Sequence, residues 1–188
     1  KQLDVSKLKE LLAKNNIDNS AVYQWQDHYV IFAKIADVGV MQSRLQNNFP
    51  EAEVKVYYDM FYEYSKKKHC ADNTVASEWD HVLLTANLVA DKKKQQEYLD
   101  YHATQFEKWP DIAKGFCNDN FQQLLIFRNG RQLMLVISIP KGKTLDELNS
   151  KTVENNPKML EWNKIMGKYQ EGIEGTKKGE SWVFLKRL

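Results

Sequence analysis

The chain has 188 residues, of which 43% are hydrophobic and 28% charged, as in an ordinary globular protein. This length accommodates one large domain or two small ones. Because 27 basic residues are balanced by 25 acidic ones, the net charge is only +2, and nucleic acid is not an expected partner. No apolar run approaches the roughly 20 residues of a membrane-spanning helix, so we expect no membrane span.

Two features leave the cellular compartment open. Cys70 and Cys117 lack the spacing of metal ligands, and the sequence is equally consistent with one disulfide between them or with two free thiols. The chain begins with Lys1 rather than Met, so we expect that a preceding segment has been removed. If that segment was a signal sequence, the protein is periplasmic or secreted; otherwise it is cytoplasmic.

Residues 1–64 are predicted to form a reduced ferredoxin-like unit. Leu8, Leu11 and Leu12 lie on one face of a short helix, for which Ser6 is the expected cap. The expected elements are the tail of a strand at 2–5, a helix at 6–14, hairpin strands at 21–25 and 29–35, a helix at 38–48 and a strand at 54–62. A polar segment without periodicity, 65–77, is predicted to be a linker.

Residues 78–188 are predicted to form a complete ferredoxin-like unit. Asn129-Gly130 stands between two apolar runs and is a strong hairpin signal, because both residues tolerate positive φ. The expected elements are a strand at 81–89, a helix at 92–114 kinked by Pro110, hairpin strands at 121–127 and 131–139, a helix broken near Pro157 and ending near 170, and a strand at 182–186. This βαββαβ order is the ferredoxin-like plan.

The sequence therefore predicts an α+β fold of two tandem ferredoxin-like units. Each four-stranded sheet covers one face with its own helices and leaves the other face bare. Packing the two bare faces together would form an intramolecular α+β barrel, a pseudo-dimer within one chain, and two such chains could pair further. A single irregular α+β domain is the alternative.

Tyr98 and His102 are the candidate chemical pair. They are four residues apart, so on a helix they lie on one face and can converge on one ligand. Imidazole titrates near neutral pH, and a phenol donates or accepts a hydrogen bond while keeping its proton. The first unit has only leucines on its corresponding helix, so we interpret it as a degenerate copy without a site.

Three further side chains are predicted to contact a substrate. Trp162 offers an apolar indole face of the kind that packs on a pyranose ring, and Asn163 beside it can both donate and accept hydrogen bonds. Gln122 adds an amide on the strand 121–127. Motifs for zinc, for a phosphate-binding loop and for nucleophilic catalysis are absent from the sequence, so no metal or cofactor is expected.

Residues 80–186 resemble the L-rhamnose mutarotase family. The matching residues are Tyr98, His102, Trp109-Pro110, the hairpin 121–139, Asn155-Asn156-Pro157-Lys158, Glu161-Trp162-Asn163, Tyr169-Gln170 and Gly179-Glu180-x-Trp182. The resemblance implies a ferredoxin-like fold, a dimeric arrangement and cofactor-free interconversion of the α and β anomers of a sugar. It implies that His102 is the catalytic residue and that Tyr98, Trp162 and Asn163 contact the sugar. Family members carry a further aromatic contact on the second strand, near the position of Gln122 or Leu124, and neither of these residues is aromatic.

The resemblance thus predicts an isomerase, a mutarotase for L-rhamnose or a related 6-deoxy sugar. Two alternatives remain open. One is a non-catalytic sugar-binding or accessory protein whose pocket was altered when the two units became fused. The other is a cofactor-free monooxygenase-like α+β barrel enzyme, whose pocket would be mostly apolar.

Overall fold

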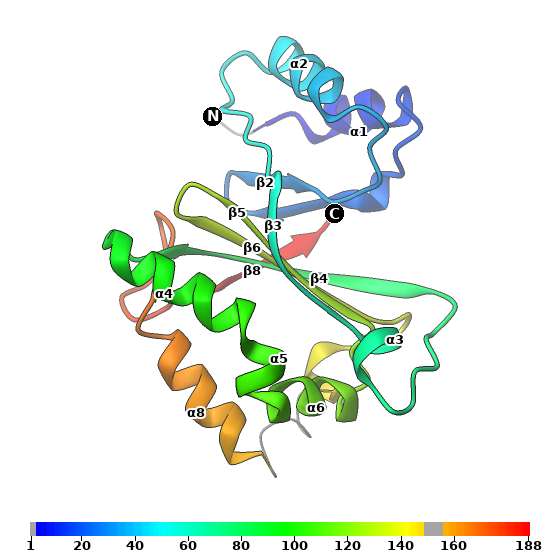
Figure 1. Ribbon diagram of the computed structural model, residues 1–188. Helices are drawn as coiled ribbons and strands as arrows, with labels where there is room; N and C mark the ends of the chain where they lie inside the picture. The colour runs from blue at the N-terminus through cyan, green and yellow to red at the C-terminus, as the bar shows by residue number, and fades with distance from the viewer. Residues whose placement is uncertain (1–2, 149–155) are drawn as a thin grey trace. The chain divides into compact units, whose positions relative to one another are not determined.

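The computed structural model describes residues 3–148 and 156–188 (Figure 1). Asn155, one of the residues that carry the resemblance, lies outside these ranges. The chain divides into two compact units, one formed by Lys1–Val56 with Phe184–Leu188 and the other by Tyr57–Val183. In the part of the chain that is described, no helix has the length and apolar character needed to cross a membrane.

The first unit is a small helix and hairpin assembly. Its elements are α1 (Val5–Ala13), the short 3-10 helix η1 (Asn19–Ala21), β1 (Val22–Trp25), β2 (His28–Ile31) and α2 (Val38–Asn48), together with most of β8 (Val183–Arg187). Strand β1 pairs antiparallel with β2 and, through Tyr23 and Gln24, with the end of β8. Leu8, Leu12 and Met41 form its core with neighbouring apolar side chains.

Two elements of the ferredoxin-like unit predicted for residues 1–64 were wrong. Residues 3–5 do not form the end of a strand, because the Asp4 carboxylate accepts a hydrogen bond from the Lys7 amide at 3.0 Å and starts α1 at Val5. Gln2 lies outside the described residues. The strand expected at 54–62 is β3 (Asp59–Ser65), which belongs to the second unit and pairs there with β5 (Gln123–Asn129). Its buried Tyr62 and Tyr64 belong to the larger core, which explains the pairing.

The second unit is an antiparallel sheet with helices on one face. After β3 come α3 (Lys66–His69), β4 (Trp79–Leu88), α4 (Lys92–Ala103), α5 (Gln105–Lys108), α6 (Pro110–Asn118), β5 (Gln123–Asn129), β6 (Gln132–Pro140), α8 (Pro157–Met166) and β7 (Gln170–Glu171). The strands pair in the order β4, β6, β5, β3, and β7 pairs with β4. This combination of helices and antiparallel sheet confirms the predicted α+β class.

The predicted hairpin and the predicted helix break are both present. Asn129 and Gln132 flank a turn in which Gly130 has a φ of 59°, the left-handed conformation that glycine adopts without steric cost. The long helix expected at 92–114 is three helices, since it breaks at Thr104 and again at Trp109. Pro110 opens α6, where the missing amide hydrogen would have had no partner inside the helix.

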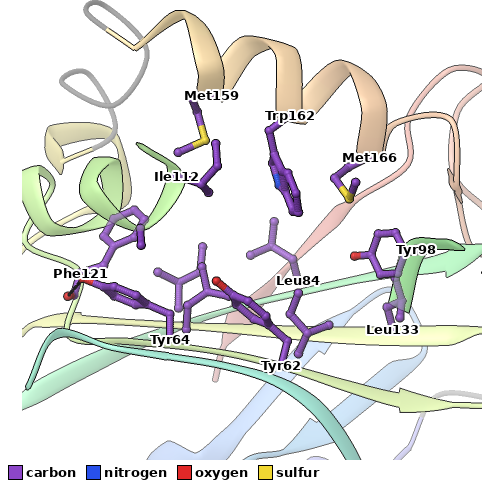
Figure 2. Packing of buried hydrophobic residues seen from close by; sticks show 14 of the residues in the cluster. Tyr62, Tyr64, Leu84, Tyr98, Ile112, Phe121, Leu133, Met159, Trp162 and Met166 are labelled. Atoms are coloured by element: carbon purple, nitrogen blue, oxygen red, sulfur yellow. Dashed lines mark hydrogen bonds between the residues drawn. The ribbon is translucent and has the colours of Figure 1, made fainter. Parts of the chain in front are cut away.

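The helices bury a mixed aromatic and aliphatic core against the sheet. Figure 2 shows Trp162 and Met166 projecting from α8 toward Leu84, Tyr62 and the sheet. Trp162 and Met166 are one helical turn apart and therefore lie on the same face. Helix α8 is fixed at its start by the Asn156 side chain, which caps Met159 and donates to the Asp111 carbonyl.

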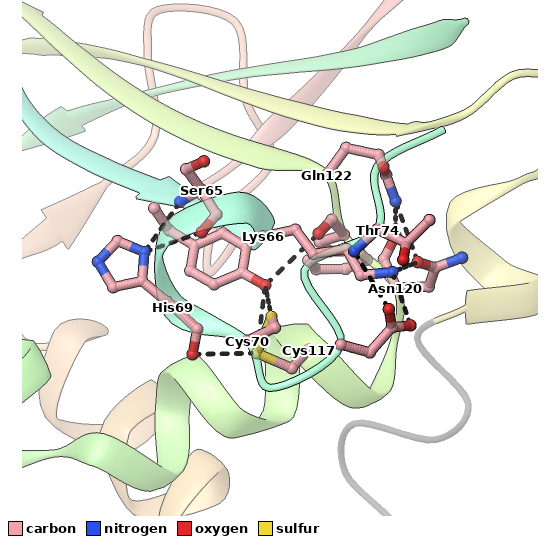
Figure 3. The surroundings of a disulfide bond; sticks show 11 residues. Ser65, Lys66, His69, Cys70, Thr74, Cys117, Asn120 and Gln122 are labelled. Carbon is pink, nitrogen blue, oxygen red and sulfur yellow. Dashed lines mark hydrogen bonds and ion pairs between the residues drawn. A yellow bond between two sulfur atoms is a disulfide. The ribbon is translucent and has the colours of Figure 1, made fainter. Parts of the chain in front are cut away.

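A disulfide joins Cys70 and Cys117, whose Cα atoms are 5.6 Å apart (Figure 3). Of the two states left open by the sequence, the bonded one is present. The hydroxyl of Tyr64 lies 3.0 Å from the sulfur of Cys70, and it is the donor because a disulfide sulfur carries no hydrogen. The bond ties the segment after α3 to helix α6.

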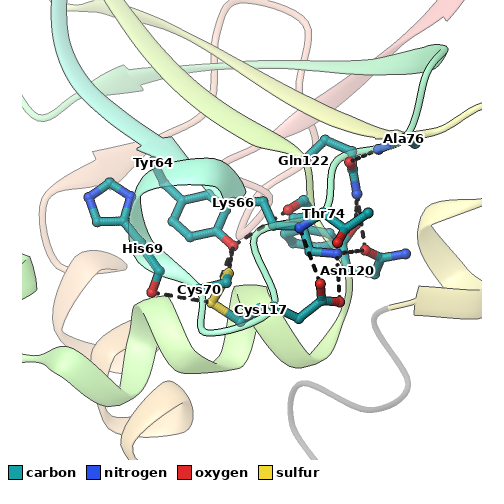
Figure 4. A network of polar contacts seen from close by, with 11 residues as sticks. Tyr64, Lys66, His69, Cys70, Thr74, Ala76, Cys117, Asn120 and Gln122 are labelled. Carbon is teal, nitrogen blue, oxygen red and sulfur yellow. Dashed lines mark hydrogen bonds and ion pairs between the residues drawn. A yellow bond between two sulfur atoms is a disulfide. The ribbon is translucent and has the colours of Figure 1, made fainter.

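A polar network continues from this bond along the segment that was expected to be a linker (Figure 4). The buried Lys66 ammonium donates to the Asn120 side chain at 2.8 Å. The Gln122 amide donates to the Asn120 carbonyl at 2.8 Å and accepts from the Ala76 amide at 2.7 Å. The segment is therefore attached to the second unit at both Cys70 and Ala76.

Candidate active site

The imidazole of His102 is surrounded by aromatic rings of the second unit. From β3 come Phe61 and Tyr62, whose ring centroids lie 5.7 and 5.1 Å from that of His102. Tyr98 lies 4.3 Å away on the same helix, and Trp162 of α8 lies 5.3 Å away. His102 is only 5% exposed, so these rings replace most of its water.

Local sequence explains why the rings meet. Asp91 caps α4 by accepting hydrogen bonds from the amides of Lys93 and Lys94. Within the helix, Tyr98 and His102 are four residues apart and therefore lie on the same face. In β3 the pairing register shifts between Met60 and Tyr62. Such a bulge re-aims side chains, and it accounts for two successive strand residues, Phe61 and Tyr62, both contacting His102.

The hydrogen bond at Nδ1 fixes the tautomer of His102. Nδ1 lies 2.9 Å from the carbonyl oxygen of Tyr98, and a carbonyl only accepts, so Nδ1 carries the hydrogen. Burial lowers the pKa of His102 from 6.5 to about 4, so the ring is neutral at pH 7. Nε2 then has a free lone pair, and within residues 3–148 and 156–188 it receives no hydrogen bond.

The Tyr98 hydroxyl is available as a hydrogen-bond donor, whereas Nε2 of His102 is available as an acceptor. Its oxygen accepts a hydrogen bond from Nε2 of Gln170 at 3.2 Å, which leaves its own hydrogen without an acceptor in the described part of the chain. Burial raises the pKa of Tyr98, so the hydroxyl stays protonated. Tyr98 and His102 thus form a complementary pair one helical turn apart, one an unused donor and the other an unused acceptor.

The structure brings together three of the five predicted site residues. Tyr98, His102 and Trp162 share the cluster, whereas Asn163 is exposed because neighbouring helix positions are about 100° apart. Gln122 is buried, but both ends of its amide are engaged with Asn120 and Ala76 in the network beside the disulfide. These two amides do not line the cluster around His102.

Several residues of the site were missed by sequence reasoning. Phe61 and Tyr62 were assigned to the first unit, and nothing local in β3 signals that it joins the other sheet. The hydroxyl of Tyr62 donates to the Gln105 side chain at 3.0 Å, and both residues are buried. Gln170 and Trp182 stood in matching segments of the resemblance, which was a signal, but they were given no role.

The buried neutral imidazole makes the stability of the fold depend on pH. The pKa of His102 is 6.5 when solvated and about 4 in the folded protein, so between these values the unfolded state binds more protons. The stabilisation is complete above pH 6.5, and about 3 kcal/mol of it is lost as pH falls to 4, since one pKa unit corresponds to about 1.4 kcal/mol. Urea titrations at both ends of this range measure the loss. In His102→Asn the loss of stability between pH 6.5 and pH 4 should be about 3 kcal/mol smaller than in the wild type, because asparagine does not titrate. An equal loss in the two proteins would contradict the assignment to His102.

Comparisons with known proteins identify the family of this chain. A sequence model of the L-rhamnose mutarotase family matches residues 81–188, which include Tyr98, His102 and Trp162. The L-fucose mutarotase of Xanthomonas campestris pv. campestris is 25% identical over 77 residues, which are 40% of this chain. The matched part spans 60% of the length of that relative. Since the family model covers more than half of the chain, this protein belongs to the L-rhamnose mutarotase family.

Proposed function

We propose that this protein is a cofactor-free mutarotase that interconverts the α and β anomers of L-rhamnose or a related 6-deoxy sugar. The observation that carries the proposal is the complementary pair of Tyr98 and His102. Opening a sugar ring requires one proton to be removed from the anomeric hydroxyl and another to be given to the ring oxygen. A free lone pair and a free hydroxyl hydrogen, one helical turn apart, are the groups that this reaction needs.

In the proposed reaction, Nε2 of His102 takes the proton of the anomeric hydroxyl. The electron pair of that O–H bond forms the carbonyl, the bond between the anomeric carbon and the ring oxygen breaks, and the ring oxygen takes the proton of Tyr98. The open-chain aldehyde rotates, and the same transfers in reverse close the ring on the other face. Because burial disfavours both imidazolium and phenolate, the charged intermediate state is short-lived and the protons return.

The surroundings of the pair support a deoxy sugar as substrate. Trp162 offers an indole face to the C–H groups of a pyranose, and Phe61 adds an apolar surface suited to the methyl group of a 6-deoxy sugar. Asn163 and Gln122 lie away from these rings and are left out of the proposal. Since His102 is 5% exposed, a sugar that reaches Nε2 has to displace a side chain of the cluster.

Saturation-transfer NMR on the anomeric protons of L-rhamnose, L-fucose and D-glucose tests the proposal. We expect added protein to accelerate anomer exchange of the 6-deoxy sugars more than that of glucose. Heat-denatured protein is the control. Broadening of the sugar signals without faster exchange would favour a non-catalytic sugar-binding protein. If the folded protein has no effect on the signals of any of the three sugars, the proposal is overturned.

A further inference from the structure

A chain of hydrogen bonds runs from Trp182 through Gln170 to the hydroxyl of Tyr98. The indole Nε1 of Trp182 donates to Oε1 of Gln170 at 2.9 Å, and Nε2 of Gln170 donates to the Tyr98 hydroxyl at 3.2 Å. An indole nitrogen can only donate, so it fixes which end of the Gln170 amide is oxygen. The nitrogen of that amide therefore faces Tyr98, and the direction of every bond in the chain is determined.

The backbone holds this chain in place. Gln170 is paired with Leu88 at the end of β4, the strand that leads into α4 and Tyr98. Trp182 is brought close by Gly172, since a Cβ built at that glycine would lie 2.6 Å from the carbonyl oxygen of Glu180. The absence of a side chain at residue 172 thus permits the close approach of the two segments.

We infer that Gln170, oriented by Trp182, is a positioning residue that makes Tyr98 a proton donor to the sugar. A glutamine oxygen facing Tyr98 would capture the hydroxyl hydrogen, whereas the amide nitrogen occupies a lone pair of the phenol oxygen and leaves the hydrogen for the substrate. The inference rests on the proposed mutarotase function and assigns it a second set of residues, which act through Tyr98 and do not contact the reacting atoms.

The variant Gln170→Glu tests the direction of the bond. A carboxylate has the shape of the amide but only accepts, so it takes hydrogen bonds from both Trp182 and Tyr98 and turns the phenol proton away from the sugar. At pH 7 we expect kcat for anomer exchange to fall by about 10²-fold, the size of one general acid–base contribution, with KM changed little. Protonation of the introduced carboxylate restores a donor. The rate of the variant relative to that of the wild type at the same pH should therefore rise as pH is lowered through the pKa of that carboxyl group, and this ratio cancels the loss of the His102 base form that both proteins share.

Three comparisons separate the possible results. Gln96→Glu places the same charge on an exposed position of α4 and should keep the wild-type rate and pH profile. Trp182→Phe should slow exchange in the wild type and have no further effect in Gln170→Glu, since its contribution passes through residue 170. An active wild type together with a fully active Gln170→Glu would overturn the inference alone. So would a slow Gln170→Glu whose rate relative to the wild type at the same pH does not rise as pH is lowered. A folded wild type without exchange activity would instead overturn the proposed function, and the inference with it.

Discussion

The variant His102→Asn is expected to exchange sugar anomers 10²- to 10⁴-fold more slowly than the wild type, the usual contribution of a general base. Asparagine can still donate to the Tyr98 carbonyl in place of Nδ1, but it has no group that accepts a proton at neutral pH. The rate is measured by saturation transfer at saturating L-rhamnose. His28→Asn, on the hairpin of the first unit, is the matched control and should keep the wild-type rate.

The pH profile of the wild type tests the same residue independently. The base form of His102 is required, and its pKa in the folded protein is about 4, so the rate should be constant above pH 5 and fall as pH drops through 4. A histidine in water would lose activity already near pH 6.5. A midpoint near 6.5, or a fully active His102→Asn, would show that another group removes the proton.

Helix periodicity and turn chemistry were sufficient to predict much of the second unit. The spacing of Tyr98 and His102 depends only on the helical repeat, and it places the two side chains together in any helix. The hairpin at Asn129-Gly130 follows from the conformational freedom of two residues. Trp162 and Met166 are four residues apart, so any helix through them brings both side chains to one face, which is the buried one.

Long-range pairing was beyond such reasoning. Strand β3 has the alternating burial of any half-buried strand. Its pairing with β5 depends on which core buries Tyr62 and Tyr64, and that is a property of the whole fold and not of the local sequence. Phe61 and Tyr62 could not be assigned to the site without knowing this pairing or the bulge beside them. Asn163 was predicted to contact a sugar because its amide side chain can donate and accept hydrogen bonds. Its position one residue after the buried Trp162 places it on the exposed face of the helix.

The second large effect concerns the disulfide. Replacing both Cys70 and Cys117 by serine should lower the free energy of unfolding by about 4 kcal/mol, the chain-entropy value for a bond between residues 47 positions apart. The corresponding fall in Tm is roughly 8 to 16 °C for a protein of this size. Urea unfolding of the double variant against the oxidised wild type measures the difference.

The thiol reductant dithiothreitol provides the internal control for this prediction. It should lower the stability of the wild type to that of the double variant and leave the double variant unchanged. Equal stability of the oxidised and reduced wild type would mean that the core and the network of Lys66, Asn120 and Gln122 close the 70–117 loop without the bond.

Because proteins of this kind are stable by only about 5–15 kcal/mol, a loss of about 4 kcal/mol would remove a large share of the total. The disulfide also anchors the segment between β3 and β4, and β3 supplies Phe61 and Tyr62 to the site, so reduction should weaken catalysis in the same samples that report the loss of stability.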